Sequence, residues 1–292
     1  MILIGENLNV MSKTLGPAMK ARDPKPIQEM AAAETEAGVD YIDVNIGPAR
    51  KAGDELMTWL VEIIQEVTDL PLFLDTTNVQ AIEAGLRVHK GRAVINSIMA
   101  RPERMDALFP LAQKYNAGGV ALLWGPEGMP RDANERGALA AELMYKASEY
   151  GVPNEDLWID PIVTPVNTQQ DQVKSCLEFM TMFRELAPEC KGICGLSNVS
   201  NGAPDHLRPI LNQTYLIMLQ KYGMTSAIVD AFDANLKAVA RGEREGLVKL
   251  VWNVMDGEEI DMSSLSKEEV DYVKTTKVLL GRTLYSDSWL QL

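Results

Sequence analysis

Short apolar runs alternate along the chain with longer stretches whose apolar residues recur at helical spacing. A stretch such as Glu55–Val67 is a predicted helix because its large apolar residues fall on one face. Those residues are Leu56, Trp59, Leu60, Ile63, Ile64 and Val67. The apolar runs are predicted strands, namely Ile2–Gly5, Tyr41–Ile46, Leu72–Asp75, Ala93–Asn96, Val120–Trp124, Trp158–Val163, Ile193–Ser197 and Ala227–Ala231. Glycines at 38, 151 and 223 stand where helices end and predict left-handed C-caps.

Eight strand-then-helix units favour an α/β fold closed as a (β/α)8 TIM barrel over an open doubly wound sheet. After the eighth strand, Leu236–Met255 has a helical pattern and Glu258–Ser264 is a polar excursion. Ser266 with Glu269 predicts a capping box that opens a last helix to Leu280. We find no interdomain linker and no Gly-rich dinucleotide or Walker motif, so residues 1–292 are predicted to be one domain with extra C-terminal helices.

Charge and composition exclude several classes of function. Lys and Arg total 28 against 41 Asp and Glu, a formal net charge of −13, which disfavours nucleic acid and anionic membrane as partners. The sequence has no leader pattern after Met1, and no apolar run approaches the about 18 residues of a membrane span. Three cysteines without close pairing suit a reducing compartment. We therefore expect a cytoplasmic protein.

Six predicted strands end in a carboxylate or an amide where a core strand would simply turn. In a barrel of this kind the active site lies at the C-terminal ends of the strands, so these side chains are expected to share one mouth. Each residue alone could equally be a turn or strand-end residue. The strand-end side chains are Glu6, Asn7 and Asn9, Asp43 and Asn45, Asp75 and Asn78, Asn96 and Ser97, Asp160, and Ser197 and Asn198.

Other common site chemistries are weak in this chain. The sequence contains no nucleophile elbow, and the isolated His89 and His206 are interpreted as surface or structural groups. A zinc site built from Cys176, Cys190, Cys194 and His206 is a poor match to metal-ligand spacing, so no intrinsic metal is expected. No Asp-x-His-x-x-Gly motif, which would place an imidazole under a corrinoid cobalt, occurs at either histidine.

Seven short motifs follow one another along the chain. They are Ile4-Gly5-Glu6-Asn7-Leu8-Asn9, Asp43-Val44-Asn45-Ile46-Gly47-Pro48, Leu74-Asp75-Thr76-Thr77-Asn78, Ile95-Asn96-Ser97, Ile159-Asp160-Pro161, Gly195-Leu196-Ser197-Asn198-Val199-Ser200 and Thr283-Leu284-Tyr285-Ser286-Asp287-Ser288. Together these motifs resemble those of the methyltetrahydrofolate:corrinoid methyltransferases, within the wider pterin-binding superfamily. The similarity extends over nearly the whole barrel, although the segment 241–266 is longer than in acetogenic members.

The resemblance implies methyltetrahydrofolate as substrate, a separate corrinoid protein as cobalamin-carrying partner, and a homodimer. It assigns the pterin edge to Asp75 and Asp160, with Asn96 satisfying the remaining donor and acceptor positions. Gly195 and Ser197 would let backbone approach the ring, and Glu6, Asn9 and Asp43 would complete the pterin site. Asn198 matches the family's catalytic amide, which supports N5 as its bond to the methyl group weakens. The direction of transfer stays open.

Two alternatives remain at this point. A dihydropteroate synthase-like enzyme would need cations for a pterin pyrophosphate, whereas Asp230-Ala231-Phe232 follows the eighth strand in place of Ser-x-Arg. A non-catalytic folate-binding or corrinoid-docking accessory protein would keep the pocket without the reaction.

Overall fold

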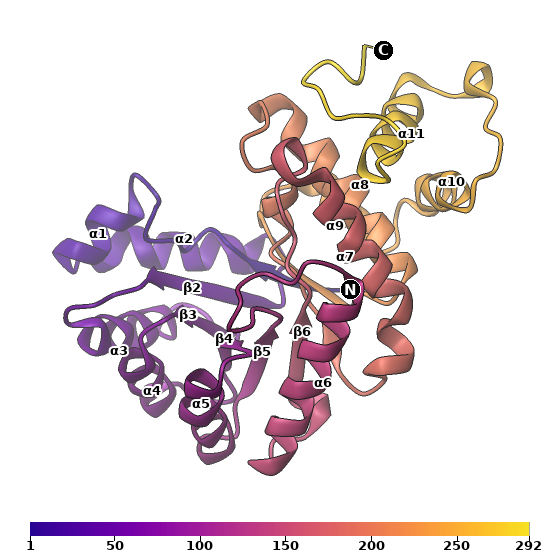
Figure 1. The fold of residues 1–292 in the computed structure, drawn as a ribbon. Helices are drawn as coiled ribbons and strands as arrows, with labels where there is room; N and C mark the ends of the chain where they lie inside the picture. Colours follow the sequence, from indigo (N-terminus) through magenta and orange to yellow (C-terminus); the bar gives the residue numbers. More distant parts are fainter. Residues whose placement is uncertain (292) are drawn as a thin grey trace.

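The computed structural model describes residues 1–291 and shows eight parallel strands wound into a barrel, with helices around it (Figure 1). The strands are β1 (Ile2–Gly5), β2 (Tyr41–Gly47), β3 (Leu72–Thr76), β4 (Val94–Met99), β5 (Gly118–Leu122), β6 (Leu157–Asp160), β7 (Lys191–Gly192) and β8 (Ser226–Val229). Their ladders run in the order β7-β6-β5-β4-β3-β2-β1-β8. A parallel bridge between Gly195 and Ile228 joins the two ends of this series, so the barrel fold predicted from the sequence is confirmed.

Helices follow the strands and cover the outside of the barrel. They are α1 (Leu15–Ala21), α2 (Pro24–Glu36), α3 (Gly53–Ile64), α4 (Val79–Val88), α5 (Pro102–Lys114), α6 (Ala133–Glu149), α7 (Val166–Leu186), α8 (Arg208–Lys221), α9 (Ala234–Ala240), α10 (Glu245–Asp256) and α11 (Lys267–Leu279). Short 3₁₀ turns lie at Asn154–Asp156, Leu196–Ser200, Asp205–Leu207 and Met262–Ser264. The C-terminal helices α10 and α11 pack on α8, beyond the ring of barrel helices (Figure 1).

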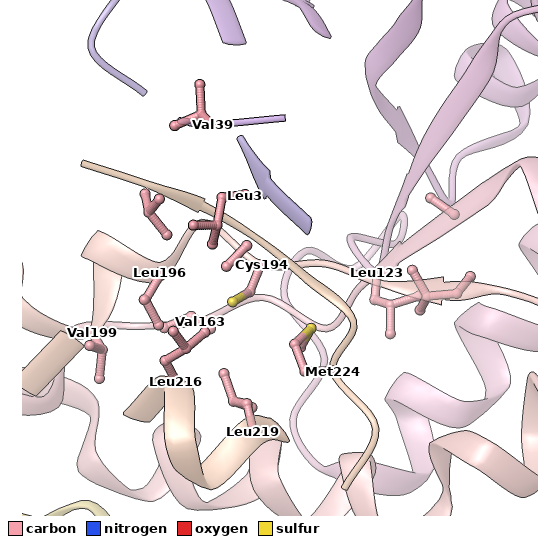
Figure 2. Close-up of a cluster of buried hydrophobic side chains, with 14 of the residues drawn as sticks. Leu3, Val39, Leu123, Val163, Cys194, Leu196, Val199, Leu216, Leu219 and Met224 are labelled. Atoms are coloured by element: carbon pink, nitrogen blue, oxygen red, sulfur yellow. The ribbon is translucent and has the colours of Figure 1, made fainter. Parts of the chain in front are cut away.

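Two apolar layers hold the barrel together. The larger layer fills the space between strands and helices, where Cys194, Leu196 and Val163 lie near Leu216 and Leu219 of α8 (Figure 2). The smaller layer fills the inside of the barrel, with the buried side chains Ile4, Phe73, Val94, Val120, Trp158 and Ile193. Side chains alternate between the two faces of a strand, and this alternation assigns each strand residue to one layer or the other.

Three aromatic rings form the centre of the inner layer. Tyr41, Phe73 and Trp158 meet edge to face, with ring centroids 5.2 to 5.5 Å apart. Edge-to-face contact is a favourable arrangement for aromatic rings, since the positive edge of one ring meets the negative face of another. The rings therefore close the barrel interior with a rigid apolar layer below the strand ends.

Most predicted elements agree with the structure to within a few residues, but the seventh strand does not. The sequence predicted Ile193–Ser197, whereas β7 is the shorter Lys191–Gly192 and Leu196–Ser200 forms a 3₁₀ turn. A backbone hydrogen bond from Asn198 to Gly195 (3.3 Å) replaces ladder pairing in that turn. The predicted strand was wrong there because its apolar residues enter the core from a turn.

Two helical predictions also need correction. Leu236–Met255 is split into α9 and α10 at Gly242, whose φ of 83° ends the first helix. Val67 lies beyond the end of α3 and is 39% exposed, so it does not belong to the buried face. The capping box of Ser266 and Glu269 is confirmed, as are the left-handed glycines 38, 151 and 223.

Candidate active site

A layer of polar side chains lies directly above the apolar interior, at the C-terminal ends of the strands. The next inward-facing position lies two residues further along each strand, because side chains alternate. Ile4 is thus followed by Glu6, Phe73 by Asp75, and Trp158 by Asp160. The complete layer is Glu6, Asp43, Asp75, Asn96, Leu122, Asp160, Gly195 and Asp230. The strand ends that the sequence singled out therefore converge on one mouth.

Two carboxyl groups from adjacent strands, those of Asp43 and Asp75, lie close enough for each to affect the pKa of the other. Two carboxyl groups at such close range share a hydrogen bond only when one of them carries a proton. Asn96 Nδ2 donates to Asp43 Oδ1 at 2.9 Å, and Asn45 Nδ2 donates to Asp75 Oδ2. Burial, with the charge of Asp75 nearby, raises the pKa of Asp43 well above its usual range, and burial raises the pKa of Asp75 to about 6. Asp43 is therefore the protonated partner.

Two glutamates lie beside this pair. Ser197 Oγ donates to Glu6 Oε2 at 2.9 Å, which links the ends of β1 and β7. Glu34 reaches in from α2, is fully buried, and accepts the backbone N–H of Asn7 at 3.0 Å. Burial raises the pKa of Glu6 to about 6 and the pKa of Glu34 to about 7. Near pH 7, Glu34 is therefore about half protonated, whereas Glu6 is mostly ionised.

Asp160 lies across the barrel from these groups, at the end of β6. Its Oδ1 accepts the backbone N–H of Ile162 at 2.8 Å, so the carboxylate is fixed by its own turn. Burial raises the pKa of Asp160 to about 6, while the backbone bond and the positive charge of Arg136 act in the opposite direction. The result is an anchored carboxylate that is mostly ionised above pH 7.

The 3₁₀ turn after β7 carries the amide that the sequence singled out. The side chain of Asn198 is exposed and forms no hydrogen bond within residues 1–291. A Cβ atom at position 195 would lie 3.0 Å from Asn198 Nδ2, so glycine lets this amide lie close against the strand end. The Asn198 amide is therefore available to a ligand in the mouth.

Among the predicted site residues, Asn9 directs its side chain into its own loop and away from the polar layer. Its backbone bridges to Asn45 at the rim, but its Oδ1 accepts the N–H of Met11 at 2.8 Å within the same loop. Asn78 likewise is the N-cap of α4, accepting the N–H of Ala81 at 3.2 Å. These two strand-end amides shape loops, and their side chains lie outside the polar layer.

A cavity of about 620 Å³ opens beside the β1, β7 and β8 strand ends. Its lining combines acids and amides with one cation and one aromatic ring, including Glu6, Ser197, Arg208, Asp230, Phe232 and Asn235. A larger cavity of about 760 Å³ lies at the opposite end of the barrel, against Met1, Arg241 and Trp252. The larger cavity is remote from the polar layer, so the smaller one belongs to the candidate site.

Sequence reasoning missed two acids of the mouth, Glu34 and Asp230. Glu34 follows Ile27 and Ala31 on the buried face of α2, so a charged residue on an apolar helical face was the available signal. Asp230 accepts a hydrogen bond from Asn7 Nδ2 at 3.0 Å, which ties the end of β8 to β1. Its position two residues after the inward-facing Ile228 would have predicted it.

His89 and the three cysteines lie in structural surroundings, whereas His206 is exposed at the surface. Burial lowers the pKa of His89, whose Nε2 accepts the N–H of Leu72 at 3.2 Å. The three cysteines are buried and free. Within residues 1–291, no three His, Cys, Asp or Glu side chains gather as a metal-binding group, and no helix has the length and apolar character to cross a membrane.

Comparison with known proteins matches this geometry to one family. The family model described as pterin binding enzyme matches residues 5–230. The chain is 29% identical to a methylcorrinoid:tetrahydrofolate methyltransferase of Eubacterium limosum over 232 residues, covering 79% of this chain and 85% of that protein. It is 30% identical to a methionine synthase of Mycobacterium tuberculosis over 241 residues, or 79% of this chain and only 20% of that longer protein.

Solved structures agree at the level of the fold. A dihydropteroate synthase of Xanthomonas albilineans with bound 4-aminobenzoic acid superimposes with a TM-score of 0.63 at 17% identity. The superposition covers 84% of this chain and 93% of that one. At this identity the likeness extends to the barrel alone.

Proposed function

The chain belongs to the pterin-binding enzyme family, and from that premise we propose that it is a methyltransferase acting on methyltetrahydrofolate and a corrinoid protein. The methyl group would move between N5 of the folate and the cobalt of a corrinoid carried by a separate chain. The relative from Eubacterium limosum, a methylcorrinoid:tetrahydrofolate methyltransferase by name, is similar over 85% of its length and supports transfer between these two carriers in one direction or the other. The observation that carries the proposal is the polar layer of carboxyl and amide groups at the strand ends.

The hydrogen-bonding groups of the polar layer match those of a pterin. One edge of a pterin presents N–H donors in an amidine-like arrangement, and carboxylates accept such donors in charge-assisted bonds. We assign this edge to Asp160 and Asp75, with Asn96 beside them in register with Asp75. The aromatic layer below closes the site with apolar contacts on its inner side.

The methyl transfer itself needs help at N5, because a tertiary amine is a poor leaving group. Toward the corrinoid, the N5–methyl bond breaks, its electron pair remains on N5, and N5 takes up a proton while the cobalt electron pair forms the new bond to carbon. We propose that the Asn198 amide supports N5 as this charge redistributes. The protons held by Asp43 and, in part, by Glu34 near neutral pH place a supply within the same mouth.

A dihydropteroate synthase-like reaction is the less well-supported alternative. A pyrophosphate leaving group calls for cations, but no position of the polar layer is positively charged, and five of its eight residues are acids. Their charges would repel a pyrophosphate. The solved synthases resemble the chain in fold at 17% identity, which does not favour their chemistry.

The decisive experiment mixes the protein with methyltetrahydrofolate and a reduced corrinoid protein and follows the cobalt absorption spectrum. Conversion of Co(I) to methyl-Co(III) is the expected result, and the reverse reaction is followed from methyl-Co(III) with tetrahydrofolate. Tight folate binding without turnover in either direction would indicate an accessory protein. Product from a dihydropterin pyrophosphate and p-aminobenzoate would indicate a synthase instead.

We further propose that the protein acts in the cytoplasm as a homodimer of single-domain chains. The acidic composition and the three unpaired cysteines support this location, and the resemblance to the corrinoid methyltransferases supports the dimer. Sedimentation equilibrium of the purified protein tests the oligomeric state directly.

A further inference from the structure

A fully buried arginine lies behind the candidate pterin site. Arg136 stands on α6, on the same face as Ala140, Leu143 and Ala147, and its side chain has no exposure to solvent. A guanidinium keeps its positive charge in proteins, and burying a charge is unfavourable unless it is compensated. Such a group at an otherwise apolar position calls for a specific role.

The hydrogen-bond partners of Arg136 are all neutral. Its Nε donates to the Pro161 carbonyl at 2.7 Å, Nη1 donates to Ser175 Oγ at 2.8 Å, and Nη2 donates to Gln172 Oε1 at 2.9 Å. Among residues 1–291 it forms no ion pair with a carboxylate. These bonds orient the guanidinium but leave its charge without a direct partner.

The carbonyl that Arg136 holds belongs to the turn that carries Asp160. Asp160 precedes Pro161, and its carboxylate accepts the N–H of Ile162 on the other side. Ile162 has a φ of 68°, a left-handed conformation that is strained for a β-branched residue. A hydrogen bond to the middle of this turn opposes its relaxation and fixes the direction of the Asp160 side chain.

The charge of Arg136 also acts on Asp160. The titratable groups facing this region from other elements are Cys176 of α7, Cys194 after β7 and Tyr215 of α8. Burial raises the pKa of Cys176 to about 11 and the pKa values of Cys194 and Tyr215 well above their usual ranges, so all three are neutral. Arg136 is thus the cation that favours ionised Asp160 against the effect of burial.

We infer that Arg136 is a positioning residue for pterin recognition, which holds the Asp160–Ile162 turn in place and keeps the Asp160 carboxylate ionised. This inference rests on the proposed function only in the identity of the ligand. The two effects serve one purpose, since a charge-assisted bond needs both an ionised acceptor and a fixed direction.

The first test does not depend on any ligand. Carbon-detected NMR of the Asp carboxyl groups gives the titration of Asp160, with Asp160→Asn identifying its signal. Replacing the cation in Arg136→Gln should raise the pKa of Asp160 by about one unit, a tenfold change in proton affinity, while Arg136→Lys should leave it near the parent value. An unchanged Asp160 titration in a folded Arg136→Gln protein would overturn the electrostatic part of the inference.

The second test measures methyltetrahydrofolate binding by calorimetry from about pH 6 to about pH 9. In Arg136→Gln the rise in the dissociation constant should be largest at pH 6, where the ionised fraction of Asp160 falls about fivefold. By pH 9, where Asp160 is ionised again, the rise should shrink to the factor caused by loss of the bond to Pro161 alone. Arg136→Lys should weaken binding by a similar factor at every pH, because the charge stays while the bond to Pro161 is lost. A uniform loss in Arg136→Gln, or no loss in either variant, would contradict the inference.

Two controls separate this role from general stability. Ser175→Ala removes one bond to Arg136 and keeps the charge, so it should not move the pH profile. Arg87→Gln removes an exposed arginine from α4 and should change neither measurement. If the parent protein titrates as expected but binds no folate, the proposed function fails while the role of Arg136 toward Asp160 stands.

Discussion

The two sides of the mouth hold equally buried carboxyl groups in opposite surroundings. Behind Asp160 lies the cation Arg136, and behind Asp75 lies a second carboxyl group, that of Asp43. Burial raises the pKa of each acid, but its neighbour determines whether the group loses or shares a proton. One side of the mouth therefore offers a carboxylate beside a cation and the other side a carboxyl pair that retains one proton, although both derive from the same strand-end pattern.

The largest loss of kcat/KM should come from replacing Asn198, which is not one of the carboxyl groups compared above. Asn198→Ala should lower kcat/KM by about 10²–10³, or roughly 2–4 kcal/mol, because one preorganised donor to a developing charge is lost. Folate affinity should change much less, as measured by calorimetry beside steady-state rates. Asn198→Asp keeps the size and can carry a proton, so recovery of rate at low pH would mean that proton transfer to N5 limits turnover. Variants that turn over like the parent would make Asn198 a turn residue only.

The next test compares the two carboxylates directly. Asp160→Asn should weaken methyltetrahydrofolate binding by ~2–4 kcal/mol at pH 8, because an ionised acceptor is replaced by an amide. Asp75→Asn should weaken binding in the same direction but less, since Asp75 already shares a proton with Asp43. The double variant should be non-additive if both groups hold one ring. Equal and additive losses would remove the distinction between the two sides.

The free energy of unfolding should depend on pH through the buried carboxyl group of Glu34. Burial raises the pKa of Glu34 from 4.5 to about 7, so the folded state binds a proton that the unfolded state has released. Stability from this group is present below about pH 4.5 and is lost as pH rises through 7. Glu34→Gln should therefore gain about 2–3 kcal/mol relative to the parent between pH 5 and pH 8, measured by urea unfolding. Parallel curves for the two proteins would show that Glu34 is ionised throughout.

Removal of metal ions should have no effect on the rate of methyl transfer. If the paired Asp43 and Asp75 held a divalent cation instead of a proton, exhaustive chelation would abolish methyl transfer. Neither proposed substrate is a thiol that needs zinc to form a thiolate, so we expect the rate to survive chelation. Loss of activity that zinc alone restores would overturn the protonated-pair interpretation and revive a cysteine or carboxylate metal site.

The sequence predicted the barrel and most of its polar layer because both follow from strand alternation. Glu6, Asp75 and Asp160 each stand two residues after an inward apolar side chain, a relation that needs no tertiary information. The same relation would have found Asp230. The seventh strand was misplaced because an apolar 3₁₀ turn and a short strand have the same hydrophobic signature.

Glu34 and Arg136 could not be placed from sequence. Each lies on a helix, and its contact with the mouth depends on which helical turn packs behind which strand end. That packing is set by loop lengths and crossing angles rather than by local pattern. A charged residue on a buried helical face signals a partner, but only the structure identifies the partner as the Asn7 backbone or the Pro161 carbonyl.

The aromatic layer of Tyr41, Phe73 and Trp158 has a consequence for proton traffic. This layer is apolar and packed edge to face, so it offers no chain of polar groups from the mouth to the opposite end of the barrel. Protons are therefore not relayed to the mouth along the barrel axis. On the proposed function, a folate and a corrinoid protein bound over the mouth would shield it from solvent. The proton that N5 takes up would then come from carboxyl groups that were protonated before the complex formed.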